Sequence, residues 1–118
     1  MAIENNSQQR RILYVTAGSS STKGYPDFPQ ADQILALPFE AVTQAALAEF
    51  APELVVFPLF SGALDATEVL TALNGLGYRG RCLVLTQSLP RPKLIEAELR
   101  GYAGDMAVEL MVIDAGKS

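Results

Sequence analysis

The stretch 52–62, PELVVFPLFSG, constrains the fold of this chain more than any other segment. Four consecutive apolar residues follow its opening Pro-Glu pair. Such an unbroken run is typical of a strand that is buried on both faces, as in the middle of a parallel sheet. In open parallel sheets the functional groups lie at the carboxyl ends of the strands, and at that end this chain places Pro58. The stretch therefore predicts a fold far more clearly than it predicts an enzymatic activity.

Composition excludes several classes of function. The 118 residues fit one domain, and with 49% hydrophobic and 19% charged residues the chain can bury a core. A net charge of -4 disfavours a nucleic-acid backbone or an anionic membrane as the main partner. The absence of histidine and the single cysteine, Cys82, remove Ser-His and Cys-His catalysis and an internal disulfide. The polar start and the lack of a membrane-length apolar run predict a cytoplasmic protein.

Strands and helices alternate along residues 11–118, which we interpret as a single domain after an N-terminal arm over residues 1–10. A loop over 17–33 contains Pro26 and Pro29, which exclude a long helix there. The alternation elsewhere implies a parallel five-stranded sheet with right-handed crossovers. The predicted strands cover 11–16, 34–37, 54–59, 81–87 and 108–113. The predicted helices cover about 39–50, the segment capped by Asp65 up to Gly75, and the segment that Pro90 and Pro92 introduce, up to Tyr102.

From residue 34 to residue 113 the chain resembles the response-regulator receiver domain, a flavodoxin-like fold. PELVVFPL is similar to the receiver's third strand, a proline-acid-hydrophobic run that usually ends in aspartate. LNGLGYRGRCLVLTQS is similar to the end of its third helix, a turn and its fourth strand, which normally closes on serine or threonine, here Thr86. The resemblance implies a module of bacterial-type signalling.

The sequence lacks the residues with which receivers carry out phosphorylation. Pro58 stands where receivers carry the phosphorylated aspartate, and Thr16, Ala17 and Gly18 stand where they carry the acids that hold magnesium. The fifth strand and its end, 108–114, contain no lysine. Transfer of a phosphoryl group to aspartate needs a carboxylate nucleophile, a divalent ion and a neighbouring cation. The sequence therefore indicates a degenerate receiver, or pseudo-receiver, that is not an enzyme and uses no metal or cofactor.

Two helices of the receiver pattern are also missing from the sequence. The loop 17–33 replaces the first helix, and the sequence stops where the last helix would begin. Both helices would cover the same face of the sheet. We therefore expect that face to be covered by a second copy, as a homodimer, or by a larger protein partner.

Three further patterns carry weaker hypotheses. Ser19, Ser20, Ser21 and Thr22 follow the first strand, where flavodoxins hold a phosphate, so the alternative function is a nucleotide or flavin binder that uses the loop 17–23. Thr86 is best explained as a β-branched strand end. The chain also carries a cluster of bases that could form a partner surface: Arg79, Arg81, Arg91, Lys93 and Arg100.

Overall fold

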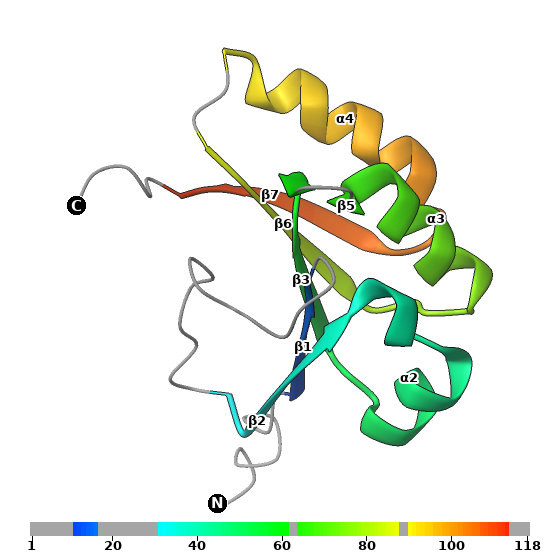
Figure 1. Cartoon of the computed structure of the whole chain (residues 1–118). Helices are drawn as coiled ribbons and strands as arrows, with labels where there is room; N and C mark the ends of the chain where they lie inside the picture. Colours follow the sequence, from blue (N-terminus) through cyan, green and yellow to red (C-terminus); the bar gives the residue numbers. More distant parts are fainter. Residues whose placement is uncertain (1–10, 17–30, 62–63, 88–89, 114–118) are drawn as a thin grey trace, which may run out of the picture.

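The computed structural model describes residues 11–16, 31–61, 64–87 and 90–113 (Figure 1). Five strands form one sheet: β1 (Arg11–Thr16), β2 (Gln33–Pro38), β3 (Leu54–Pro58), β6 (Arg81–Thr86) and β7 (Ala107–Val112). Two short strands, β4 (Phe60–Ser61) and β5 (Leu64–Asp65), pair separately as an antiparallel hairpin. The helical elements are the 3-10 helix η1 (Phe39–Ala41) and the α-helices α2 (Gln44–Phe50), α3 (Ala66–Gly75) and α4 (Pro92–Ala103).

The strand order of the main sheet is β2-β1-β3-β6-β7, and every neighbouring pair is parallel. Counted in chain order, this is the 2-1-3-4-5 arrangement of flavodoxin-like folds. The predicted α/β fold with a five-stranded parallel sheet is therefore confirmed. β3 lies at the centre of the sheet, as its unbroken apolar run indicates, and Val55, Val56 and Phe57 are completely buried.

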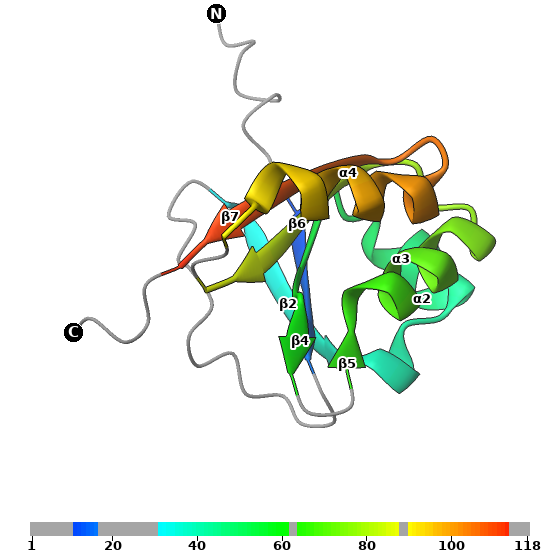
Figure 2. The same cartoon turned by 90° about the horizontal axis from the view of Figure 1, so that it is seen from above.

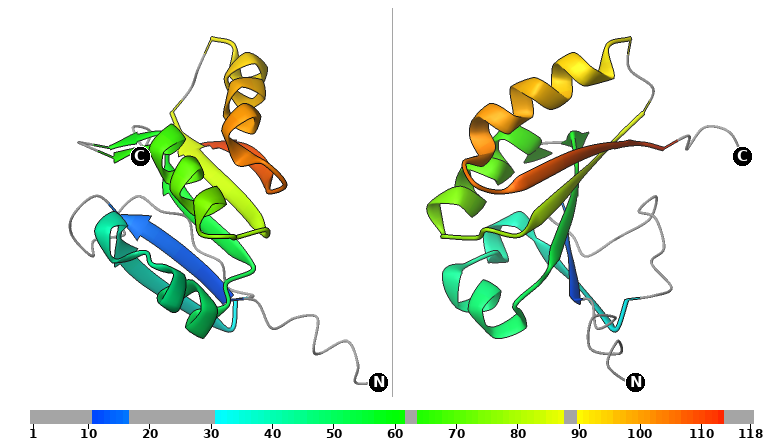
Figure 3. Two further views of the ribbon diagram at one scale, coloured as in Figure 1. Left: turned by 90° about the vertical axis from the view of Figure 1, so that its right-hand side faces the viewer. Right: turned by 180° about the vertical axis from the view of Figure 1, so that it is seen from behind.

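The three α-helices cover one face of the sheet (Figures 2 and 3). Side chains alternate along each strand, so Val55 and Phe57 of β3 point to the helices whereas Val56 points to the opposite face. The main core fills the space between this face and the helices. Its helical members include Leu47 of α2, Leu70 of α3 and others on α4.

The second face of the sheet carries a smaller apolar cluster at its centre. Its fully packed members are Ile12, Tyr14, Val56 and Leu85, and all four are buried within the single chain. On this face the exposed large apolar side chains lie on the outermost strands: Ile34 of β2 is 47% exposed and Met111 of β7 is 36% exposed. The receiver-pattern helices expected to be missing correspond to 17–30 and 114–118, which lie outside the described residues.

The segment 39–50 differs from the single helix that the sequence predicts. The structure has η1, a break, and then α2, which begins after Thr43. Thr43 has extended backbone angles and its Oγ1 accepts a hydrogen bond from Ala46 N (3.1 Å), so it caps α2 and ends the preceding turn. The helix ends at Phe50, and the next residue, Ala51, adopts the left-handed conformation (φ 51°). Pro52 follows and disfavours a helical residue before it.

The start of α3 agrees with the predicted cap. Asp65 Oδ1 accepts hydrogen bonds from Thr67 N (2.9 Å) and Thr67 Oγ1 (2.8 Å). Asp65 is the last residue of β5, so the β4–β5 hairpin, which no local sequence pattern predicts, positions it at the start of α3.

We expect Asp65→Ala to lower the free energy of unfolding by about 1 kcal/mol, because it removes the acceptor of the Thr67 N–H in the first turn of α3. Urea unfolding followed by circular dichroism measures the change. Glu68→Ala is the matched control, since Glu68 is an exposed acid in the same helical turn and should cost less. Equal losses for the two variants would contradict the role of Asp65 as the cap.

Candidate functional site

The carboxyl edge of the sheet is the position at which open α/β folds bind ligands. The five strands of this sheet end on Thr16, Pro38, Pro58, Thr86 and Val112. None of these side chains titrates in the physiological range. Thr16, at the place of the magnesium-binding acids of receivers, is buried. The edge therefore lacks a general acid, a general base and a charged nucleophile at its strand ends.

Pro58 and Thr86 were the two receiver-like positions identified from the sequence. Pro58 pairs with Leu85 in the sheet, and the next residue, Leu59, donates its N–H to Leu85 O (2.7 Å). By strand alternation Pro58 lies on the second face, whereas Thr86 lies on the helix-covered face. Thr86 Oγ1 donates to the carbonyl of Gln87 (3.0 Å). The structure thus gives Thr86 a local backbone partner and directs the two side chains to opposite faces.

Asp65 is the described acid that follows β3 most closely along the chain. Its Oδ1 already accepts two hydrogen bonds at the start of α3, so this oxygen serves the helix. Across the described ranges, no group of three or more acidic, cysteine or histidine side chains is arranged to hold a metal ion. The alternative phosphate loop, with Ser19, Ser20, Ser21 and Thr22, lies outside the described residues and stays a prediction.

The five bases of the predicted partner surface lie on two segments of the chain, and their role as a partner surface stays a prediction. Two lie around the amino end of β6, and three lie on α4 or immediately before it. Three of the five bases form exposed ion pairs with acidic side chains, and such pairs contribute little to stability. The pairs are Arg79 with Asp105 (2.5 Å), Arg81 with Glu109 (3.9 Å) and Arg100 with Glu96 (3.8 Å).

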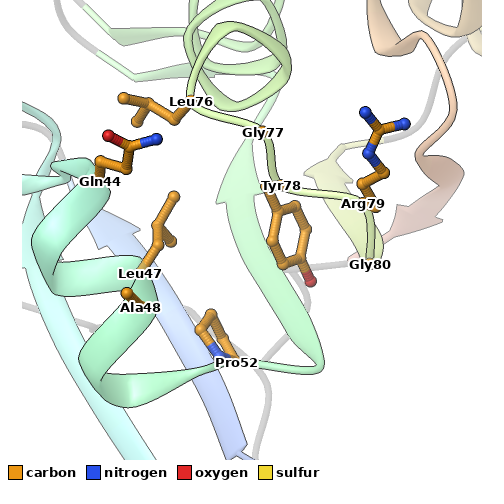
Figure 4. A pocket seen from close by; sticks show the side chains of 9 residues that line it. All are labelled: Gln44, Leu47, Ala48, Pro52, Leu76, Gly77, Tyr78, Arg79 and Gly80. Atoms are coloured by element: carbon orange, nitrogen blue, oxygen red, sulfur yellow. The ribbon is translucent and has the colours of Figure 1, made fainter.

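A groove of about 450 Å³ opens at the amino edge of the sheet, between α2 and the connection from α3 to β6 (Figure 4). No local sequence pattern predicts this groove, since it is formed by segments that are distant along the chain. Figure 4 shows Leu47 and Tyr78 on either side of it and the Arg79 guanidinium directed away. The lining residues are Gln44, Leu47, Ala48, Pro52, Leu76, Gly77, Tyr78, Arg79 and Gly80.

Tyr78 is the only titratable side chain that faces this groove in Figure 4. Its hydroxyl donates to Arg81 O (3.0 Å), and its ring packs so closely on Gly80 that a Cβ there would collide with the hydroxyl. Burial raises the pKa of Tyr78, with a smaller contribution from Cys82. The phenol is therefore neutral at physiological pH and held by a backbone carbonyl. The groove is therefore lined mainly by apolar groups and this neutral phenol.

Cys82 lies in the core beneath the helices, as its position in an apolar strand indicates. It is a free thiol, with its Sγ 3.8 Å from Met106 Sδ. Burial raises the pKa of Cys82 from 9.0 to about 12, so the thiol keeps its proton at neutral pH. Because the thiolate is the reactive form, this residue is inert in the folded chain.

The raised pKa of Cys82 predicts how stability depends on alkaline pH. Between pH 9 and 12 the unfolded chain loses the thiol proton while the folded chain keeps it. The free energy of unfolding therefore falls as pH rises through this window, at most by about 1.4 kcal/mol per pH unit from this residue. Denaturant unfolding of the wild type and Cys82→Ala across this range should show their difference in stability shrinking with pH. A constant difference would contradict the assignment.

The fold and the candidate site are interpreted from this chain alone. No protein-family model, curated protein or solved structure matches it. No helix in the described part of the chain is long and apolar enough to cross a membrane. What the structure shows is a flavodoxin-like strand order whose carboxyl edge carries no titratable strand-end residue.

Proposed function

We propose that this chain is a non-catalytic, receiver-like signalling module that acts through protein–protein contact and needs no phosphorylation. The observation that carries the proposal is the carboxyl edge of the sheet. There β3 ends on Pro58 and β1 ends on the buried Thr16. The same edge holds the phosphorylation chemistry in the receiver domains that the sequence resembles. The free thiol of Cys82 agrees with the cytoplasmic setting that we propose for it.

Each part of the receiver reaction would need a group that these positions do not supply. Proline offers no nucleophile, and a threonine is a weak ligand for magnesium compared with a carboxylate. The nearest described acid after β3, Asp65, already caps α3. A module with such an edge can still transmit a signal through its surfaces, because docking depends on shape and apolar area and needs no reactive group.

We propose that self-association uses the second face of the sheet. The centre of this face is buried, and its margins expose Ile34 on one outer strand and Met111 on the other. Arg81 and Glu109 add an exposed ion pair on the same face. Apolar side chains at the margin of a buried cluster extend it when a second copy packs against them. A homodimer is the simplest arrangement that buries them, and a larger protein partner is the alternative.

Incubation with acetyl phosphate and magnesium should leave the mass of the intact protein unchanged, because Pro58 cannot accept a phosphoryl group. Mass spectrometry at neutral pH, before and after mild acid, detects an acid-labile adduct. A phosphorylatable receiver treated in parallel is the positive control. An acid-labile phosphoryl group on this chain would contradict the proposal of a phosphorylation-independent module.

Ile34→Lys should shift the protein toward a single-chain mass, since it places a charge in the proposed contact. Sedimentation velocity at micromolar concentration measures the change. Leu94→Lys is the matched control, because Leu94 is 58% exposed but lies on α4, on the helix-covered side. If the wild type is already a monodisperse monomer, or if both variants dissociate it equally, the second face is not the contact.

A further inference from the structure

We propose that the outer edge of β7 is a second self-pairing surface, and that the carboxylate of Glu96 on α4 keeps it closed. When Glu96 leaves this edge, β7 pairs with β7 of a second copy as an antiparallel strand. This contact is separate from the one on the sheet face. Among the described strands, β7 is the last in the sheet and pairs with β6 alone.

The direction of the backbone amides in β7 follows from two hydrogen bonds at its ends. The N–H groups of Ala107 and Ile113 donate to carbonyls of the β6 segment, at 3.2 and 2.7 Å. In a parallel pair, alternate residues direct their backbone groups to the same neighbour. The amides of Val108, Leu110 and Val112 therefore point away from β6, along the outer edge of the sheet.

The side chain of Glu96 accepts a hydrogen bond from the central one of these three outer amides, that of Leu110. Leu110 N donates to Glu96 Oε2 at 3.3 Å, and Arg100 Nη2 lies 3.8 Å from the same oxygen. Residues 96 and 100 are one helical turn apart on α4, which packs along β7 (Figure 3). The side chain of Glu96 is only 25% exposed, so it is held against the strand. Its charge also stands where the carbonyl oxygen of an added strand would approach.

The rest of the β7 edge has the properties of a strand that can add another. Val112 is 49% exposed and Met111 is 36% exposed, so the carboxyl half of β7 is apolar and accessible. An outermost strand with unpaired amides is a template for pairing with another chain, and natural proteins block such edges with charged side chains. Glu96 fits that role, since it satisfies one amide and repels acceptors from its neighbours.

The sequence of β7 suits pairing with itself. An antiparallel arrangement with a two-fold axis through Leu110 places Val108 opposite Val112 of the second copy. All three outer residues then form hydrogen-bonded pairs, which is the alternation that an antiparallel ladder requires. On the second face, Glu109 lies opposite Met111 of the second copy. This register pairs the β-branched Val108 and Val112 and keeps the two Glu109 carboxylates from facing each other, and it is the reason that we assign the edge to a second copy.

The test replaces Glu96 in an Ile34→Lys background, so that the proposed contact through the sheet face does not contribute. Glu96→Ala and Glu96→Ser should each tighten dimerisation by at least about tenfold, measured by sedimentation equilibrium. Glu98→Ala is the matched control, because Glu98 is an exposed acid on the same helix. Glu96→Gln retains an acceptor for Leu110 N and should stay close to the wild type. Using two replacements guards against a folding defect in one of them, which thermal unfolding detects.

A second substitution assigns any new association to this edge. Val112→Pro removes one outer amide at an exposed position and should return Glu96→Ala to a monomer, since proline is tolerated on a sheet edge but cannot donate. The register is tested with a chain that carries both Glu109→Cys and Met111→Cys in the Glu96→Ala background. Residue 109 of one copy should form a disulfide with residue 111 of the other. Ala107→Cys with Met111→Cys should not. The inference is overturned if Glu96→Ala and Glu96→Ser associate no more tightly than Glu98→Ala, or if Val112→Pro leaves their association intact.

Discussion

Burial of β3 on both faces is the constraint on which the rest of the structure depends. Val55, Val56 and Phe57 have no contact with solvent, and they alternate between the core under the helices and the cluster on the second face. A strand in this position can hold only apolar side chains, since an unpaired polar group there would lose its hydration. Within the sheet, polar functional groups are therefore confined to the strand ends and the outer strands.

Among the described residues, those at the carboxyl edge of the sheet serve the fold. Pro58 continues the pairing of β3 with β6, and Asp65 caps the helix that follows. Thr86 bonds its neighbouring backbone carbonyl. A side chain whose acceptor or donor is already used by the backbone is a poor ligand for a substrate. For this reason we place the proposed function on the outer surfaces of the sheet.

The two surfaces proposed for self-association differ in what limits them. On the second face the exposed apolar area is divided between Ile34 and Met111, at opposite margins of a buried centre. At the outer edge of β7 the limit is electrostatic, because a carboxylate holds the central amide. Self-association through the second face becomes tighter with any contact that buries apolar area. Pairing at the edge of β7 depends on the position of a single side chain, which makes it sensitive to whatever competes for Glu96.

Local patterns in the sequence determined the order of strands and helices, the double burial of β3 and the cap at Asp65. These features depend on neighbouring residues, whose periodicity and hydrogen-bonding groups can be read along the chain. Sequence reasoning did not find the break at Thr43, the hairpin before α3, or the groove beside Tyr78. It also missed the bond between Glu96 and Leu110, which are 14 residues apart. Only the tertiary structure decided these, because they arise where the packing of separate elements fixes which backbone groups remain free.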